Sequence, residues 1–240
     1  LFFLIPPPHH AMLRSLVGSE MCIRDSRNRG WTLRGGLRMF TGIVAGTAPI
    51  VDIGGDDSVR TFSVDLNGFD SDLEIGASVS LDGVCMTVVD IKNGIVSFDA
   101  ISETLDRTTL SNRMVGDLLN VERSLRFGDE LGGHILSGHI IGTAEILKRE
   151  EVGDGVDFLI SIPDGCNQFI LEKGYIAVDG MSLTIGKCDE DCFFLHIIPE
   201  TLRITSIGNK SKGDLVNIEI DSRTQAMVDA MIRMGDESRI

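Results

Sequence analysis

Two copies of one short sequence place a cysteine and a serine at matched positions. Residues 81–87 read LDGVCMT and residues 178–184 read VDGMSLT, so Cys85 and Ser182 stand 97 residues apart in the same context. The serine hydroxyl could assist proton transfer, whereas Cys85 would be a polar contact in a binding pocket of the first copy. The alternative for Ser182 is a strand hydroxyl that is bonded to the backbone.

Histidines occur close to the second copy. The alignment of the two copies sets His139 opposite Ile43, so only the second copy carries both a serine and a histidine at matched positions. We expect this pair to assist proton transfer or to activate a water nucleophile, with His134 as a further candidate. The alternative for His134 and His139, which stand beside glycines, is that they are turn histidines.

The matched positions belong to a long internal repeat. Similar blocks recur in one order, and chance similarity would not hold this register over about 80 residues. The period has the size of a small domain, so the elements that position these residues are two homologous domains in tandem. The blocks are 41–48 with 137–144, 102–108 with 199–205, and 116–122 with 213–219.

Composition excludes several classes of protein. Hydrophobic residues make up 42% of the chain, enough for a core in each half. No apolar run approaches the roughly 20 residues that span a bilayer, so we expect no membrane association. The net charge is −14, and removing the +4 of residues 1–38 leaves −18. Such a field repels nucleic acid, and the expected partner is small and not strongly anionic.

Residues 1–38 look foreign to the rest of the chain. They contain the single Trp, lie outside the repeat and have no basic segment ahead of their apolar start, so they make a poor secretory signal. The stretch SLVGSEMCIRDS resembles translated sequencing-adapter readthrough. We therefore expect the natural start at Met39, the alternative being a genuine disordered extension.

The five cysteines do not form a disulfide framework. Their odd number, without a signal peptide, points to a reducing cytoplasm. The cysteines and histidines could instead bind zinc, but the chain has no Cys-x-x-Cys pair and its histidines lack the usual ligand spacing. We expect no metal at the residues considered, which are Cys188, Cys192, His134, His139 and His196.

The expected secondary structure is mostly strand. Runs rich in Val, Ile, Thr and Phe are broken by Gly, Asp and Asn about every ten residues, which predicts antiparallel strands with tight turns, including turns at 92–94 and 189–191. Closure removes exposed edges, so each half is predicted to be a small β-barrel. Residues 222–234 carry apolar side chains at helical spacing, to pack on their own domain or on another subunit.

Several motifs in order resemble the riboflavin synthase α-chain family. They are MFTGIVAGTA, the pair DGVCMTV and DGMSLTIG, GGHILSGHI, IPETL and VNIEID, and the resemblance covers residues 39–235. It implies an all-β fold of two tandem homologous six-stranded antiparallel β-barrels plus a C-terminal α-helix. The expected organisation is an extraneous extension (1–38), two lumazine-binding barrels (39–133 and 134–221) and an oligomerisation helix (222–240).

The resemblance also implies an activity. Two molecules of 6,7-dimethyl-8-ribityllumazine would give riboflavin and 5-amino-6-(D-ribitylamino)uracil, the last step of riboflavin biosynthesis, with no metal and no redox cofactor. The chain would form a cytoplasmic homotrimer, with each active site between the N-terminal barrel of one subunit and the C-terminal barrel of its neighbour. A reaction that consumes two copies of one substrate explains the duplication, because two matched pockets hold both rings together.

The same resemblance assigns the site residues. The expected catalytic set is His139, Ser182, Cys85 and His134. The expected substrate contacts are Phe40, Thr41, Gly42, Ile43, Val44, Ser78, Cys85, Met86, Thr87, Asp99, Ala100, Ile101, Ser102, Glu103, Thr104, Gly138, His139, Ile140, Lys173, Ser182, Leu183, Thr184, Ile198, Pro199, Glu200, Thr201, Leu202, Arg203 and Asp221.

Three competing functions remain at this point. A non-catalytic antenna protein of the same family would bind one lumazine or flavin, but such relatives typically lose pocket residues in one barrel, and both barrels retain theirs here. A flavin-dependent oxidoreductase would need an added nucleotide-binding domain with a Gly-rich loop after a strand, and the sequence has no such segment. A purely structural β-protein gives no reason for two matched polar strand ends.

Overall fold

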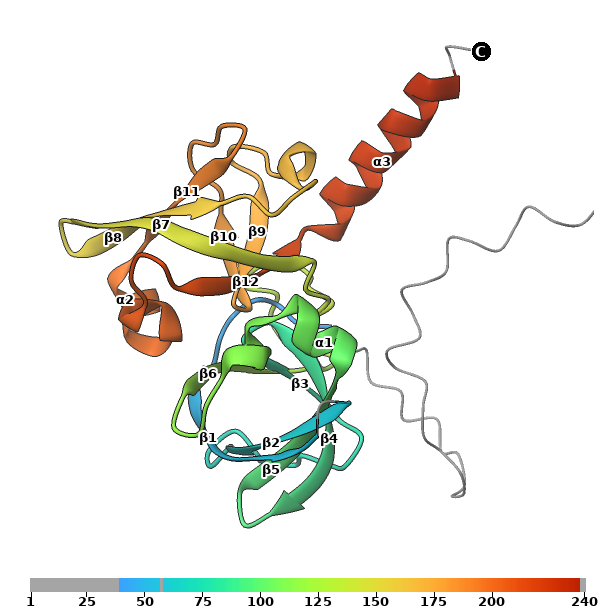
Figure 1. Ribbon diagram of the computed structural model, residues 1–240, viewed down its shortest axis with the longest axis vertical. Coiled ribbons are helices and arrows are strands. Elements are labelled where there is room, and N and C mark those ends of the chain that lie inside the picture. The colour runs from blue at the N-terminus through green and yellow to red at the C-terminus, as the bar shows by residue number, and fades with distance from the viewer. Residues whose placement is uncertain (1–38, 57, 238–240) are drawn as a thin grey trace, which may run out of the picture. The chain divides into compact units, whose positions relative to one another are not determined.

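The first repeat forms a closed barrel of six antiparallel strands in the order β1-β2-β5-β4-β3-β6 (Figure 1). The computed structural model describes residues 39–56 and 58–237. The elements are β1 (Gly46–Gly55), β2 (Val59–Asp65), β3 (Ser78–Leu81), β4 (Val84–Lys92), β5 (Ile95–Ile101), α1 (Ser102–Arg107), η2 (Thr109–Asn112) and β6 (Leu118–Arg123). The closed barrel predicted for this half is confirmed.

The second repeat forms a six-stranded sheet with the equivalent strand order, opened between β10 and β11. The chain that follows β10 bridges this gap, because Gly186 N–H donates to Phe194 O (2.8 Å) and Phe194 N–H donates to Lys187 O (2.9 Å). The elements are β7 (Gly142–Val152), β8 (Gly155–Ser161), η3 (Asn167–Phe169), β9 (Tyr175–Val178), β10 (Met181–Thr184), β11 (Cys192–Ile197), α2 (Pro199–Ile204), η4 (Ser206–Asn209) and β12 (Leu215–Ile220).

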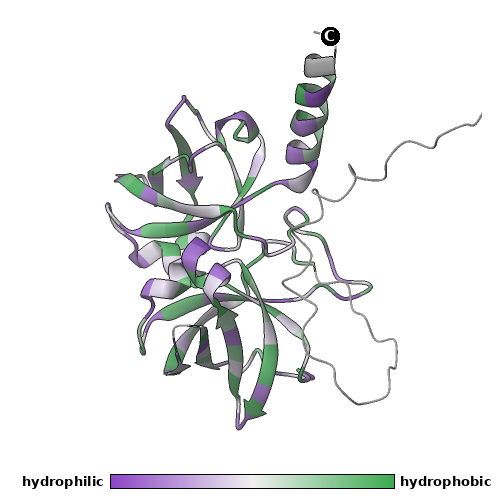
Figure 2. Ribbon diagram, turned by 45° about the vertical axis from the view of Figure 1, so that its right-hand side comes forward, coloured by the Kyte–Doolittle hydropathy of each residue, from purple (hydrophilic) through white to green (hydrophobic). Residues whose placement is uncertain are grey.

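Alternating hydrophobic residues explain why these segments are strands. Along β8, Val156, Phe158 and Ile160 are buried while their neighbours are half-buried, and β5 alternates in the same way. Side chains of a strand point to opposite faces in turn, so this pattern fills one face of the sheet. Figure 2 shows hydrophobic and hydrophilic residues alternating along several strands, and each repeat has its own large hydrophobic core.

Two matched hairpin turns meet backbone to backbone between the repeats. Asp82-Gly83 and Asp179-Gly180 have positive φ at both residues (47° and 83°, 45° and 80°), as a type I′ turn requires. A Cβ on Gly83 would lie 2.7 Å from the backbone nitrogen of Gly180. Glycine is therefore needed here both for the turn and for the close approach of the two hairpins.

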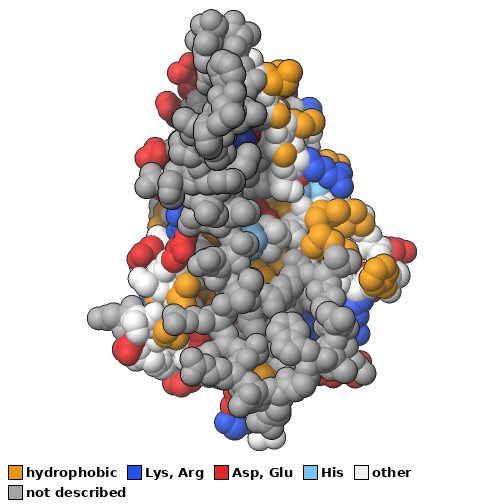
Figure 3. Space-filling model, turned by 90° about the vertical axis from the view of Figure 1, so that its right-hand side faces the viewer, with side chains coloured by type: hydrophobic (Ala, Val, Ile, Leu, Met, Phe, Trp, Pro, Cys, Tyr) orange, Lys and Arg blue, Asp and Glu red, His pale blue; other side chains and the backbone are white. Residues whose placement is uncertain are grey.

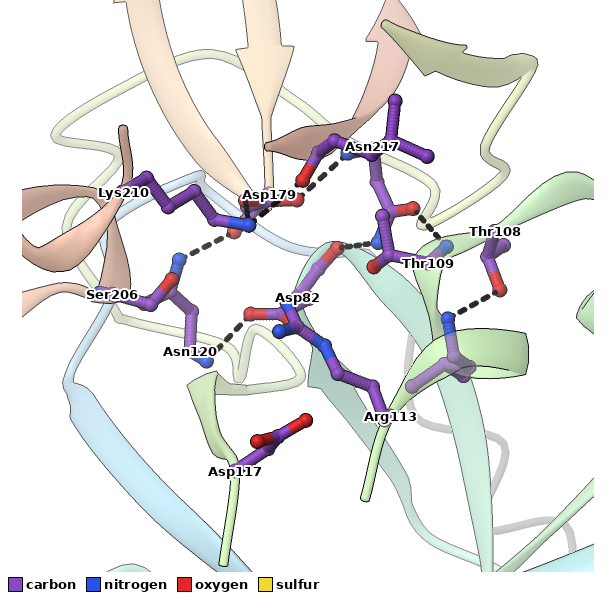
Figure 4. A network of polar contacts seen from close by, with 12 residues as sticks. Asp82, Thr108, Thr109, Arg113, Asp117, Asn120, Asp179, Ser206, Lys210 and Asn217 are labelled. Carbon is purple, nitrogen blue, oxygen red and sulfur yellow. Dashed lines mark hydrogen bonds and ion pairs between the residues drawn. The ribbon is translucent and has the colours of Figure 1, made fainter. Parts of the chain in front are cut away.

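Two buried asparagines, Asn120 and Asn217, join the repeats reciprocally (Figure 4). The Asn120 side chain donates to the carbonyl of Asp179 (2.9 Å), and the Asn217 side chain donates to the carbonyl of Asp82 (2.8 Å). Each amide oxygen also accepts a backbone N–H of the opposite repeat, from Ser206 (2.7 Å) and Thr109 (2.8 Å) respectively. The network is the same when the two repeats are exchanged.

Ion pairs complete this network. Asp82 is fully buried and its carboxylate lies 2.6 Å from Arg113, while the equally buried Asp179 lies 3.2 Å from Lys210. Burial, and then the charge of Asp179, raise the pKa of Asp82 from its ordinary value of 3.8 to about 6, against the opposing effect of Arg113 and Lys210. The folded protein therefore binds a proton here more tightly than the unfolded chain does.

This raised pKa predicts a pH-dependent stability. Because the native state holds the proton of Asp82 more tightly, its contribution is fully present below about pH 4 and is lost as the pH rises through about 6. We expect wild type to lose stability relative to Asp82→Asn over this window, as measured by urea unfolding at closely spaced pH values. Parallel pH profiles for the two proteins would contradict the assignment.

The segments that lead into the two repeats are exchanged between the barrels. We call residues 39–45 and 135–141 the lead segments; they pair with each other through Phe40 and Leu136, whose backbone groups exchange two hydrogen bonds of 2.9 Å. Val44 of the first lead segment is buried in the core of the second barrel. Ile140, its counterpart in the second lead segment, packs against the core of the first barrel. Each barrel thus contains a piece of the other repeat.

Helix α3 (Ser222–Glu237) follows the second sheet, which confirms the predicted C-terminal helix. Val228 packs against the second core, but Met227, Met231 and Met234 are 60%, 72% and 70% exposed. Figure 3 shows hydrophobic side chains exposed in the upper part of the molecule, where this helix lies. No helix of the described residues is long and apolar enough to cross a membrane.

Candidate active site

Ser182 and His134 lie in direct contact in the second repeat. Ser182 is on β10, and its Oγ lies 2.6 Å from Nδ1 of His134, which comes from the chain just before the second lead segment. The imidazole stacks on the Tyr175 ring of β9, with 5.1 Å between centroids and 23° between planes. The serine is therefore paired with a histidine whose ring plane is fixed by stacking.

The environment keeps this imidazole neutral. Burial lowers the pKa of His134 below its ordinary value of 6.5, and the nearby Asp221 only partly opposes this effect. In a neutral ring, one nitrogen carries the hydrogen and the other accepts. If Nδ1 accepts from the Ser182 hydroxyl, the ring hydrogen is therefore on Nε2. That Nε2 is buried and has no hydrogen-bond partner among the described residues. A bound molecule with an acceptor group would satisfy it.

The first lead segment holds Ser182 from the other side. The Ser182 N–H donates to the carbonyl of Gly42 (2.8 Å), and Gly42 has a φ of +74°. A Cβ at Gly42 would lie 2.5 Å from the Ser182 Cβ, and one at Gly133 would lie 2.9 Å from the Ser182 Oγ. At both positions only glycine fits, because any Cβ would collide with the Ser182 side chain.

Cys85 occupies the equivalent place in the first repeat. Its N–H donates to the carbonyl of Gly138 (3.0 Å) in the second lead segment. Gly138 has a φ of +75°, and its Cβ would lie 2.5 Å from the Cys85 Cβ, so the geometry around Ser182 is reproduced. The two residues singled out by the repeat are therefore held in the same way, each by the lead segment of the opposite repeat.

The structure separates the two predicted histidines. His134 meets Ser182, whereas His139 follows Gly138, the residue that bonds Cys85. The His139 side chain is exposed, and its backbone N–H donates to Glu219. The histidine that contacts Ser182 is therefore His134, and a catalytic role for His139 stays a prediction.

The remaining predicted contacts gather at equivalent strand ends. In the first repeat they lie on β3, β4, the end of β5 and the start of α1, and in the second just before β9, on β10, just after β11 and on α2. Asp99 accepts the Thr61 hydroxyl (2.7 Å), and Glu200 pairs with Arg203 (2.6 Å). The exposed members are Ile43, Thr87, Asp99, Ile101, Ser102, Glu103, His139, Lys173, Thr184, Ile198, Pro199, Glu200 and Arg203.

Asp221 has a structural contact that the sequence did not reveal. Its carboxylate accepts the N–H (3.1 Å) and the hydroxyl (2.8 Å) of Thr224, which caps the start of α3. Burial acts to raise the pKa of Asp221, but the bonds from Thr224 outweigh it and the pKa is lowered. The carboxylate is therefore ionised, and its charge favours the protonated form of His134.

Three residues beside the site were missed by the sequence analysis. Tyr175 is the single tyrosine of the chain and stacks on His134. Glu122 and Glu219 are buried carboxylates that bind the two lead segments. The signal that could have found them is their place at the end of the matched blocks NVE and NIE, because an acid inside a buried strand needs a specific partner.

Comparison with known proteins agrees with this geometry. A family model described as "Lumazine binding domain" matches the chain twice, over residues 41–124 and 137–221. The riboflavin synthase of Escherichia coli (strain K12) is 46% identical over 198 residues, which cover 82% of this chain and 93% of that protein. The chain belongs to the riboflavin synthase family.

Other members of the riboflavin synthase family give the same result. The enzyme of Chlamydia pneumoniae is 43% identical over 69% of this chain and 81% of its own length, and that of Brucella abortus is 39% identical over 76% and 93%. Among solved structures, LumP complexed with riboflavin matches with a TM-score of 0.71 and 31% identity, covering 76% of this chain and all of LumP. The LumP complex with 6,7-dimethyl-8-(1'-D-ribityl) lumazine matches with a TM-score of 0.69 and 29% identity, over 75% of this chain and 98% of LumP.

Proposed function

We propose that this chain is a riboflavin synthase. It converts two molecules of 6,7-dimethyl-8-ribityllumazine into riboflavin and 5-amino-6-(D-ribitylamino)uracil by transfer of a four-carbon unit. The observation that carries this proposal is the identity of 46% to a riboflavin synthase over 93% of that protein's length. The two products together contain all the atoms of the two substrates, so the reaction is balanced without an oxidant or reductant.

The two matched sites suit a reaction between two identical molecules. Cys85 and Ser182 are held by equivalent contacts in the two repeats, so each barrel can hold one lumazine in a similar orientation. Fixing both reactants replaces a bimolecular encounter and is worth up to about 7–11 kcal/mol. The two sites differ in their reactive groups, with a thiol in one and a Ser–His pair in the other. This difference sets which site holds the lumazine that donates the four-carbon unit and which holds the lumazine that accepts it.

The proton transfers are assigned to the second repeat. Neutral His134 takes the proton of Ser182, and the resulting alkoxide character lets Ser182 remove a proton from the substrate or activate a water. Cys85 is a polar contact of the first pocket. His139, which follows the glycine bonded to Cys85, stays a second candidate for proton transfer. The strand-end residues of both barrels bind the pteridine edges and the ribityl chains.

Assembly as a homotrimer in the cytoplasm is part of the proposal. Its support is the exposed apolar side of α3, where Met227, Met231, Ile232 and Met234 are 47–72% exposed in the single chain. A large exposed apolar stripe on a helix is typical of a contact with another subunit. Such a contact lets the first barrel of one subunit face the second barrel of another.

A lumazine-binding antenna protein is the second candidate. The LumP complexes with a lumazine and with riboflavin have the same fold at 29–31% identity. The riboflavin synthases match more closely, at 39–46% identity. The Ser182–His134 pair adds a reactive group that mere binding does not require.

One assay separates the two candidates. The full chain, and a second form that begins at Met39, are incubated with 6,7-dimethyl-8-ribityllumazine while riboflavin formation and lumazine loss are both recorded. We expect two lumazines lost for each riboflavin formed, without added metal or nucleotide. Tight lumazine binding without riboflavin would overturn the enzyme assignment in favour of the antenna protein.

A further inference from the structure

We propose that Glu122 and Glu219 are positioning residues that act across the two repeats, each setting the reactive residue of the opposite barrel. Glu122 of the first repeat positions Ser182 of the second, and Glu219 of the second repeat positions Cys85 of the first. The inference rests on the proposed function for the meaning of these two sites. Its structural content, however, concerns only how the lead segments are held.

Glu122 grips the first lead segment with both carboxylate oxygens. It accepts the N–H of Thr41 (2.6 Å), the hydroxyl of Thr41 (2.7 Å) and the N–H of Gly42 (3.0 Å). The next carbonyl along the chain, that of Gly42, accepts the N–H of Ser182 (2.8 Å). A continuous set of hydrogen bonds therefore runs from β6 of one barrel to the reactive strand of the other.

Glu219 grips the second lead segment in the same manner. It accepts the N–H (2.7 Å) and the hydroxyl (2.7 Å) of Ser137 and the N–H of Gly138 (3.1 Å). The Gly138 carbonyl then accepts the N–H of Cys85 (3.0 Å). The His139 backbone also donates to Glu219, so this carboxylate fixes the chain around a second candidate residue.

A carboxylate is the side chain that fits these positions. Each glutamate is nearly buried, at 7% and 5% exposed, and each accepts at least three hydrogen bonds from one lead segment. An ionised carboxylate only accepts, so both of its oxygens serve these donors. Glutamine keeps the size but directs an NH₂ group at a backbone N–H, which removes one bond and sets two donors against each other.

The hydrogen bonds of each glutamate lead to the other repeat, so this arrangement predicts which of the two sites each glutamate affects. If each glutamate only stabilised its own barrel, its loss would disturb the reactive residue of that barrel, Cys85 for Glu122 and Ser182 for Glu219. Transmission through the lead segments predicts the opposite pairing. The variants Glu122→Gln and Glu219→Gln are therefore matched controls for each other, with the same substitution at equivalent positions.

Two readouts report on the sites without any turnover. The imidazole nitrogen resonances of His134, followed by NMR against pH, report on the Ser182 pair. The rate at which iodoacetamide alkylates Cys85, mapped by mass spectrometry, reports on the first site. We expect Glu122→Gln to shift the His134 titration and leave the Cys85 rate within about twofold, whereas Glu219→Gln changes the Cys85 rate by about tenfold and leaves His134 unchanged.

Kinetics supply the link to the reaction. Both variants should lower kcat by about tenfold or more while KM changes little, because a displaced reactive group weakens the transition state more than binding. If the chain forms no riboflavin, the NMR and alkylation results still test the positioning role, so the two failures are distinguishable. Effects confined to each glutamate's own barrel, equal effects on both sites, or no effect would each overturn the inference.

Milder variants guard against a failure to fold. Thr41→Val and Ser137→Ala each remove one hydroxyl donor to a glutamate and leave the carboxylate in place. We expect the same crossed pattern with smaller amplitude, Thr41→Val at His134 and Ser137→Ala at Cys85. An uncrossed pattern in these well-folded variants would overturn the inference as well.

Discussion

Replacement of Ser182 by alanine, or of His134 by phenylalanine, is expected to lower riboflavin formation by about 10²–10⁴-fold, the usual contribution of a positioned proton-transfer group. Ser182 Oγ and His134 Nδ1 lie 2.6 Å apart, so either change removes the pair. Phenylalanine preserves the stacking on Tyr175 while it removes both ring nitrogens. The measurement is kcat for lumazine loss and riboflavin gain.

The double variant tests whether the two residues act as a unit. If they do, Ser182→Ala combined with His134→Phe should cost no more than either change alone. Activity of wild type should fall as the pH drops through the lowered pKa of His134, below 6.5, because protonation removes the base, and this limb should vanish in His134→Phe.

An ordinary strand serine provides the control. Ser63 on β2 lies 3.1 Å from the Ser97 hydroxyl, away from the repeat motif, and Ser63→Ala should leave kcat within about twofold. A loss below about tenfold for Ser182→Ala, comparable to that of the control, would reduce Ser182 to a strand hydroxyl with a structural part only.

Replacement of Asn217 by alanine is expected to destabilise the protein by about 2–6 kcal/mol, because two buried backbone groups would each lose a partner at about 1–3 kcal/mol. These groups are the Asp82 carbonyl and the Thr109 N–H, each 2.8 Å from the Asn217 amide. Asn217 is fully buried, so water does not replace the lost bonds without a rearrangement. Urea unfolding measures the loss.

The reciprocal network supplies its own comparison. Asn120→Ala leaves the Asp179 carbonyl and the Ser206 N–H unpaired in the same way, so its cost should agree with that of Asn217→Ala within about 1 kcal/mol. The exposed Asn209 is the surface control, with an expected change within about 0.5 kcal/mol. Costs below about 1 kcal/mol for both buried asparagines would contradict the importance of the network.

Much of the fold followed from the repeat and from local patterns. The alternation of apolar residues and the turn signals at 92–94 and 189–191 indicated hairpins. Both turns are present, with positive φ at Asn93 and Gly94 and a hydrogen bond from the Asp189 N–H to the Cys192 carbonyl (2.9 Å), because such turns are set by local sequence. The break of the second sheet after Thr184 did not follow, because its bridging bonds come from irregular chain around Gly186.

The pairing inside the site could not be obtained by aligning the repeats. An alignment matches each residue with its counterpart in the other copy. It singled out His139 together with Ser182 because both are reactive residues of the second copy, but it does not show which barrel a segment enters. His134 precedes the matched blocks, and it reaches Ser182 because Leu136 pairs with Phe40. Such an exchange depends on long-range contacts that neither periodicity nor propensity encodes.

The exchanged lead segments also impose an order on assembly at the ribosome. Ile140, which completes the first core, is synthesised soon after β6, so the first barrel can close early. Residues 40–44 are made before any strand of either barrel, yet Ser182, whose N–H binds the Gly42 carbonyl, is made 140 residues after Gly42. The segment that precedes all the strands must therefore wait for β10 of the second repeat, and the second barrel is completed by chain that left the ribosome before any of its own strands.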